Sequence, residues 1–205
     1  MEQIEKNILT VMYTCQIQGI SPFESIREKT GIAAGQIDVI IDNLIKNQLI
    51  NNDRVTLTEI GRNSLRIVLA GGVFDIIHPG HIYTLKAAKA LGDILAVVVA
   101  TDNTAVKMKK RRPLHSQEQR QELVNSLSMV DVCLVGQEDD MFKTVNRVRP
   151  QIIALGYDQV HQEKFIREGC ERIKLEASVA RLESPIPDSS SFKIQKEYGE
   201  SIHGI

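Results

Sequence analysis

The chain has 205 residues and a formal net charge of -1 at pH 7, so it is long enough for one or two folded domains but has no long-range attraction for nucleic acid or anionic lipid. No apolar run approaches the roughly 18 residues that span a bilayer, and the first residues, MEQIEKN, lack a signal-peptide pattern. The three cysteines lie far apart without metal-ligand spacing, and together these features predict a soluble cytoplasmic protein without membrane contact.

Residues 1–66 are predicted to form a separate small domain of three helices and a hairpin. Apolar residues at helical spacing predict helices over residues 4–15 and 37–45, and a capping box of Ser21 and Glu24 predicts a short helix between them. A polar turn at residues 51–53 separates two short apolar runs, as in a hairpin. This order of elements resembles a winged helix-turn-helix.

The charge of this domain argues against DNA binding but leaves it open. The domain contains seven lysines and arginines against eight aspartates and glutamates, and its third helix carries Asp38 and Asp42 beside the single Lys46. Carboxylates repel DNA phosphates, and a DNA reader normally presents a basic surface. A dimerisation or docking module is therefore the favoured interpretation, with DNA as the less favoured partner.

From residue 67 onward, short apolar runs alternate with helical patterns. Continuous apolar runs predict buried strands, and spacing predicts helices between them. Such alternation implies right-handed crossovers and a parallel sheet, so residues 67–205 are predicted to form a Rossmann-like α/β domain whose ligands bind beyond the carboxyl ends of the strands. The predicted strands are residues 67–71, 94–100, 130–135 and 152–155, and the predicted helices are residues 80–91, 117–127 and 141–148.

The segment GVFDIIHPGH, residues 72–81, lies between the first strand and the first helix of this domain. The first-turn N–H groups of a helix have no intrahelical partner and carry a partial positive charge, so such a turn can bind phosphate. His78 and His81 add side-chain donors at the same point. A metal site of Asp75, His78 and His81 is the alternative, but the glycines favour close approach of a phosphate. Phe74 is expected to pack the turn onto the sheet, and Asp75 to hold the turn.

This segment resembles the signature of the nucleotidyltransferase superfamily, which includes cytidylyltransferases, pantetheine-phosphate adenylyltransferases and FAD synthases. The resemblance implies that residues 67–205 form a nucleotidyltransferase domain, that Mg²⁺ accompanies the nucleoside triphosphate, and that the protein is a homodimer. It implies direct attack of a phosphomonoester on the α-phosphate of the nucleotide, with release of pyrophosphate. No residue is assigned as a metal ligand.

Later motifs supply further candidates. The basic segment 101–113 is read as a loop beyond the second strand, and Arg120 resembles an arginine that the family keeps on the following helix. The tetrapeptide GYDQ, residues 156–159, resembles archaeal-type FAD synthases, and a serine run near residue 190 resembles the family's site for the outer phosphates. The resemblance implies catalytic roles for His78, His81 and Lys107, and nucleotide contacts for Gly72, Val73, Phe74, His78, His81, Asp158, Ser190 and Ser191.

These motifs favour an FMN adenylyltransferase, which makes FAD from ATP and FMN. A cytidylyltransferase that uses CTP and glycerol 3-phosphate or a phosphorylated amino alcohol is the first alternative, although its usual RTEGIST-like segment is absent from the sequence. A transcriptional regulator that senses flavin or nucleotide is the second, because a winged helix is joined to a nucleotide site.

Overall fold

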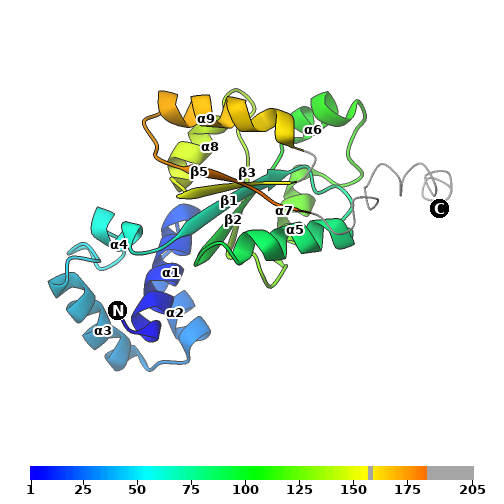
Figure 1. Ribbon diagram of the computed structural model, residues 1–205. Coiled ribbons are helices and arrows are strands. Elements are labelled where there is room, and N and C mark those ends of the chain that lie inside the picture. Colours follow the sequence, from blue (N-terminus) through cyan, green and yellow to red (C-terminus); the bar gives the residue numbers. More distant parts are fainter. Residues whose placement is uncertain (157–158, 184–205) are drawn as a thin grey trace, which may run out of the picture. The chain divides into compact units, whose positions relative to one another are not determined.

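The computed structural model describes residues 1–156 and 159–183 (Figure 1). Contacts within the chain define two compact units, the first Met1–Arg66 and the second beginning at Ile67. Among the described residues, no helix is both long enough and apolar enough to cross a membrane.

The N-terminal unit contains four helices and one antiparallel bridge. A buried apolar core joins the first three helices, and the bridge pairs Ile50 with Leu57. The predicted hairpin is thus reduced to a single pair, with the Asp53 carboxylate accepting two backbone N–H bonds in the turn. The helices are α1 (Gln3–Gln18), α2 (Pro22–Thr30), α3 (Ala34–Lys46) and α4 (Glu59–Asn63).

The predicted capping box at the start of α2 does not form. Ser21 is the N-cap residue and Pro22 follows it, but the Ser21 side chain makes no capping hydrogen bond. Glu24 instead forms an ion pair with Arg27, one helical turn further along the exposed surface. Proline at the first helical position removes one of the backbone N–H groups that would have no partner within the helix.

The second unit is built on a five-stranded parallel sheet in the order β3-β2-β1-β4-β5, which confirms the predicted Rossmann-like α/β class. Its first strand in the chain therefore lies at the centre. The fifth strand, which the sequence pattern did not predict, is an edge strand. The strands are β1 (Ile67–Gly72), β2 (Ile94–Val99), β3 (Val132–Val135), β4 (Ile152–Leu155) and β5 (Ser178–Arg181).

Helices cover both faces of the sheet, with α5 and α7 on one face and α8 and α9 on the other (Figure 1). Val68 and Ala70 of β1 pack in the core cluster with Leu85 of α5 and Val124 of α7, whereas Leu69 faces the other layer. This alternation follows from the two-residue period of a strand. The helices are α5 (Pro79–Lys89), α6 (Asp102–Lys109), α7 (Gln117–Asn125), α8 (Met141–Val148) and α9 (Glu163–Arg172), with a 3-10 turn at Val160–Gln162.

The predicted loop at residues 101–113 is a helix in its first part, α6, and residues 110–113 lie outside a helix. The Thr101 side chain accepts a hydrogen bond from the backbone N–H of Thr104, which caps the start of α6, and the helix ends at Lys110 in a left-handed conformation. Alanine, methionine and lysine are all good helix formers, so a charge run does not exclude a helix.

Candidate active site

The turn after β1 is shaped by Gly72 and Phe74. A Cβ atom on Gly72 would lie 2.9 Å from the Phe74 ring, so only glycine lets that ring fold back against the end of the strand. Phe74 itself adopts φ +52° and is only 6% exposed within the core cluster. The expectation that Phe74 packs the turn onto the sheet is confirmed.

The two histidines of the turn stack on each other at the start of α5. His78 is the N-cap residue of α5 and Pro79 follows it. The ring centroids of His78 and His81 lie 3.8 Å apart, and the Phe74 ring lies 5.2 Å from that of His81. Helix geometry therefore places both imidazoles beside the positive end of the α5 dipole.

Burial favours the neutral form of both imidazoles. The pKa of His81 is lowered to about 4, mainly because burial disfavours the charged ring, with repulsion from His78 and Lys109 adding to the effect. Burial, and then Lys109, also lowers the pKa of His78. The buried Nδ1 atoms of both rings have no hydrogen-bond partner among the described residues. A neutral imidazole with a free ring nitrogen beside a helix N-terminus suits a phosphate oxygen.

Asp75 is engaged in holding the turn. Its carboxylate, 3% exposed, accepts hydrogen bonds from Arg111 Nη1 at 2.8 Å and from the backbone N–H groups of Leu114 at 2.7 Å and His115 at 3.3 Å. These contacts fasten the loop between α6 and α7 to the signature turn. No three acidic, histidine or cysteine side chains in the described part of the chain form a metal-binding group, so the alternative metal site is not formed there.

Arg120 is fully buried and ties three segments together. Its guanidinium donates to the carbonyl oxygens of Val73 at 2.7 Å, Ala100 at 2.9 Å and His115 at 3.0 Å, and it pairs with Asp102 at 2.6 Å. It thus fixes the ends of β1 and β2 to the α6–α7 loop. The sequence suggested Arg120 only by resemblance, because nothing in its polar surroundings marks it as buried.

A cavity of about 540 Å³ opens beside the histidine pair. Gly72, Val73, Phe74, His78 and His81, all predicted site residues, line it. Lys109 of α6 lines the cavity, whereas the predicted Lys107 on the same helix does not. Gln159, from the GYDQ tetrapeptide, also lines it, together with four side chains that the sequence did not indicate, namely Thr84, Met108, His161 and Gln162.

Three of the predicted nucleotide contacts, Asp158, Ser190 and Ser191, lie outside the described residues. Gly156 and Gln159, on either side of residues 157–158, are described. The backbone N–H of Gly156, at the carboxyl end of β4, donates to Gln159 Oε1 at 2.8 Å. Gly156 and Gln159 both line the histidine cavity.

The family of this chain follows from its similarity to known proteins. A family model described as cytidylyltransferase-like matches residues 69–197. Two similar curated proteins are the FAD synthase of Aciduliprofundum boonei, 48% identical over 134 residues (65% of this chain and 80% of the relative), and that of Methanosarcina barkeri, 44% identical over 138 residues (64% and 98%). The crystal structure of the lipopolysaccharide core biosynthesis protein from Thermoplasma volcanium is 41% identical, with a TM-score of 0.56, and the match covers 58% of this chain and 98% of that one. The chain therefore belongs to the cytidylyltransferase-like family, which confirms the nucleotidyltransferase superfamily predicted from its histidine motif.

Proposed function

We propose that the chain is an FMN adenylyltransferase that converts ATP and FMN into FAD and pyrophosphate. The observation that carries the proposal is the stacked pair His78 and His81 at the start of α5, which faces a cavity at the carboxyl edge of the sheet. The curated relatives named FAD synthase, 40–48% identical to this chain, supply the choice of substrates.

In this reaction an oxygen of the FMN phosphate attacks the α-phosphorus of ATP. A new P–O bond forms there, the bond to the bridging oxygen of the β-phosphate breaks, and pyrophosphate leaves with the electron pair. No nucleophile of the protein is required, so the residues act by placing hydrogen-bond donors and charge around the reacting phosphate. His78 and His81 bind the α-phosphate oxygens, with the N-terminus of α5 behind them.

Positive charge near the leaving group comes from α6. Lys109 lines the cavity and its charge lowers the pKa values of both histidines, which supports a role for Lys109 in neutralising pyrophosphate. Lys107 remains a candidate on the same helix, and Asp158, Ser190 and Ser191 remain candidates for nucleotide contacts. Mg²⁺ would be held by the phosphates of ATP, since magnesium is commonly bound by substrate phosphates rather than by a protein cage, and it would neutralise part of their charge.

The test pairs ATP or CTP with four acceptors in the presence of Mg²⁺: FMN, glycerol 3-phosphate, phosphoethanolamine and phosphopantetheine. Pyrophosphate release is measured, and the product is identified by chromatography. Turnover with ATP and FMN, yielding FAD, supports the proposal. Turnover with CTP and a polyol phosphate instead, or nucleotide binding without turnover on any pair, contradicts it and favours the cytidylyltransferase or the regulator respectively.

We further propose that the N-terminal unit is a winged helix that serves dimerisation or docking rather than DNA recognition. Arg54, in the turn that follows α3, pairs with Asp38 at 2.8 Å and with Asp42 of that helix. The positive charge of Arg54 is thus balanced by carboxylates of the same unit. A homodimer in the cytoplasm is the corresponding expectation. Light scattering measures the mass, and fluorescence anisotropy with a labelled duplex at low salt measures DNA binding, which we expect to be absent.

A further inference from the structure

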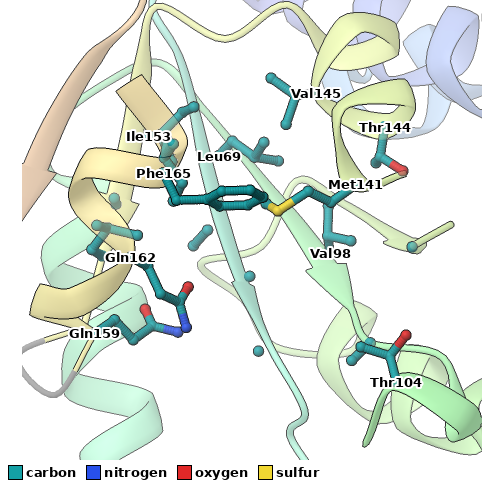
Figure 2. Close-up of a pocket in the computed structure, with 18 of the residues that line it drawn as sticks. Leu69, Val98, Thr104, Met141, Thr144, Val145, Ile153, Gln159, Gln162 and Phe165 are labelled. Atoms are coloured by element: carbon teal, nitrogen blue, oxygen red, sulfur yellow. The ribbon is translucent and has the colours of Figure 1, made fainter. Parts of the chain in front are cut away.

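A second cavity lies on the face of the sheet covered by α8 and α9 (Figure 2). Its volume is about 380 Å³, within the range of roughly 300–1,000 Å³ that is common for small-molecule sites. Leu69 of β1, Val98 of β2 and Ile153 of β4 form an aliphatic floor, and Val145 of α8 closes one side. No charged side chain of the described residues lines this cavity.

Three large apolar side chains from different helices surround this cavity while remaining open to solvent. Met108 of α6 is 51% exposed, Met141 of α8 is 42% exposed and Phe165 of α9 is 53% exposed, and all three line the cavity. Figure 2 shows the Phe165 ring reaching across toward the sulfur of Met141. Apolar side chains gathered around a hollow and left in contact with water are typical of a ligand site.

The floor of this cavity also includes backbone atoms that no side chain covers. Gly71 belongs to the central strand β1 and is paired with Val98 of β2, yet it is exposed. A Cβ atom there would meet only the Val98 carbonyl oxygen at 3.7 Å, so the space above Gly71 is open. A flat group can therefore lie directly on the strand.

This apolar cavity adjoins the histidine cavity. The two share lining residues from β1, α6, β4 and the segment after β4, so one ligand can occupy both. The polar side chains around the apolar cavity are neutral amides and hydroxyls, which can bond to polar ring edges but not balance a charge. The shared residues are Ala70, Gly71, Gly72, Met108, Ala154, Gln159 and Gln162.

We propose that the apolar cavity binds the isoalloxazine ring of FMN, with Phe165 and Met141 packing against the ring and the ribityl chain leading the phosphate to His78 and His81. This assignment rests on the proposed function and explains its choice of acceptor. Glycerol 3-phosphate or phosphoethanolamine has no apolar surface to bury in this cavity, whereas a flavin ring is large, flat and bordered by amide groups.

The first test measures steady-state kinetics of the full-length protein with substitutions Phe165→Ala and Met141→Ala. We expect KM for FMN to rise on the order of tenfold for Phe165→Ala, because ring packing and buried apolar area are lost, while KM for ATP stays unchanged. Phe165→Tyr, which keeps the ring, restores the KM for FMN. Leu123→Ala on α7 is the matched control, since Leu123 is 44% exposed and lines neither cavity.

Because Phe165 also packs against Phe142, with ring centroids 5.4 Å apart, thermal unfolding of each variant is measured in parallel. Met141→Ala then provides a second variant, on another helix, that does not disturb this aromatic pair. An unchanged KM for FMN in both alanine variants overturns the assignment even if the wild type makes FAD.

The second test is independent of turnover and uses lumiflavin, which has the ring but no ribityl phosphate. Its fluorescence is titrated with the wild-type protein and the same variants. We expect binding that Phe165→Ala and Met141→Ala weaken and Leu123→Ala does not, and competition with FMN but not with ATP. Failure of lumiflavin to bind overturns the ring site. If lumiflavin binds as expected but ATP and FMN give no FAD, the ring site stands and the proposed function fails.

Discussion

Replacing Arg120 with methionine tests whether one buried guanidinium holds the active-site edge of the sheet together. The substitution leaves the carbonyl oxygens of Val73, Ala100 and His115 without their donor, and it leaves Asp102 unpaired. An unsatisfied buried acceptor costs about 1–3 kcal/mol. Water can reach some of these acceptors and replace the lost hydrogen bonds, because Asp102 is 46% exposed and only the bond to Val73 is fully buried.

These considerations predict that Arg120→Met lowers the free energy of unfolding by about 3–5 kcal/mol, the usual cost of breaking a buried charged network. Urea unfolding followed by circular dichroism measures the change. Hydrogen exchange at the ends of β1 and β2 shows whether the loss of stability is greatest there. Arg112→Met, at an exposed arginine, is the control and should change stability by less than about 0.5 kcal/mol. A loss below about 1 kcal/mol for Arg120→Met would refute the argument that this network stabilises the site.

Three further predictions follow from the signature turn. His81→Ala should lower kcat by about a hundredfold to a thousandfold, because one fixed donor at the reacting phosphate is lost. The melting temperature should stay unchanged. A near-normal kcat would remove His81 from the mechanism. Because the pKa of His81 is lowered from 6.5 to about 4 in the folded protein, the unfolded chain binds more protons, and the free energy of unfolding should fall as pH drops from about 6.5 to about 4. His81→Gln should flatten this dependence in urea titrations, and an equally steep loss in that variant would assign the effect to other groups. Gly72→Ala should destabilise the protein by about 1–3 kcal/mol because its Cβ meets the Phe74 ring, whereas Gly35→Ala, where nothing lies within 4 Å, should not; equal effects would contradict the steric argument.

The central strands could be predicted from the sequence because they are buried on both faces and therefore appear as continuous apolar runs. β5, with the sequence Ser-Val-Ala-Arg, is a short edge strand with two exposed ends, so it carries no such signal. α6 was mistaken for a loop because its lysines were interpreted as a charge run, and charge patterning alone does not separate an exposed helix from a loop.

The histidine turn could be located because strand, glycines and helix start coincide within ten residues. What the sequence could not show is which side chains turn toward it. Lys107 and Lys109 are two residues apart on the same helix, so a rotation of about 200° separates them, and only Lys109 lines the cavity. The apolar cavity likewise depends on tertiary packing, because Met141 of α8 and Phe165 of α9 come from two helices that lie on either side of β4 in the chain.

The strand order also has a consequence for folding during synthesis. β1 is made first but lies at the centre, and its backbone at Ile67 is held by Gln151, 84 residues further along the chain. At about 5–20 residues per second, a ribosome exposes one unpaired edge of β1 for several seconds before β4 emerges. An open edge of apolar strand is a template for pairing with another chain. The nascent chain should therefore be most sensitive to aggregation, and most responsive to chaperones, in the interval between synthesis of β2 and of β4.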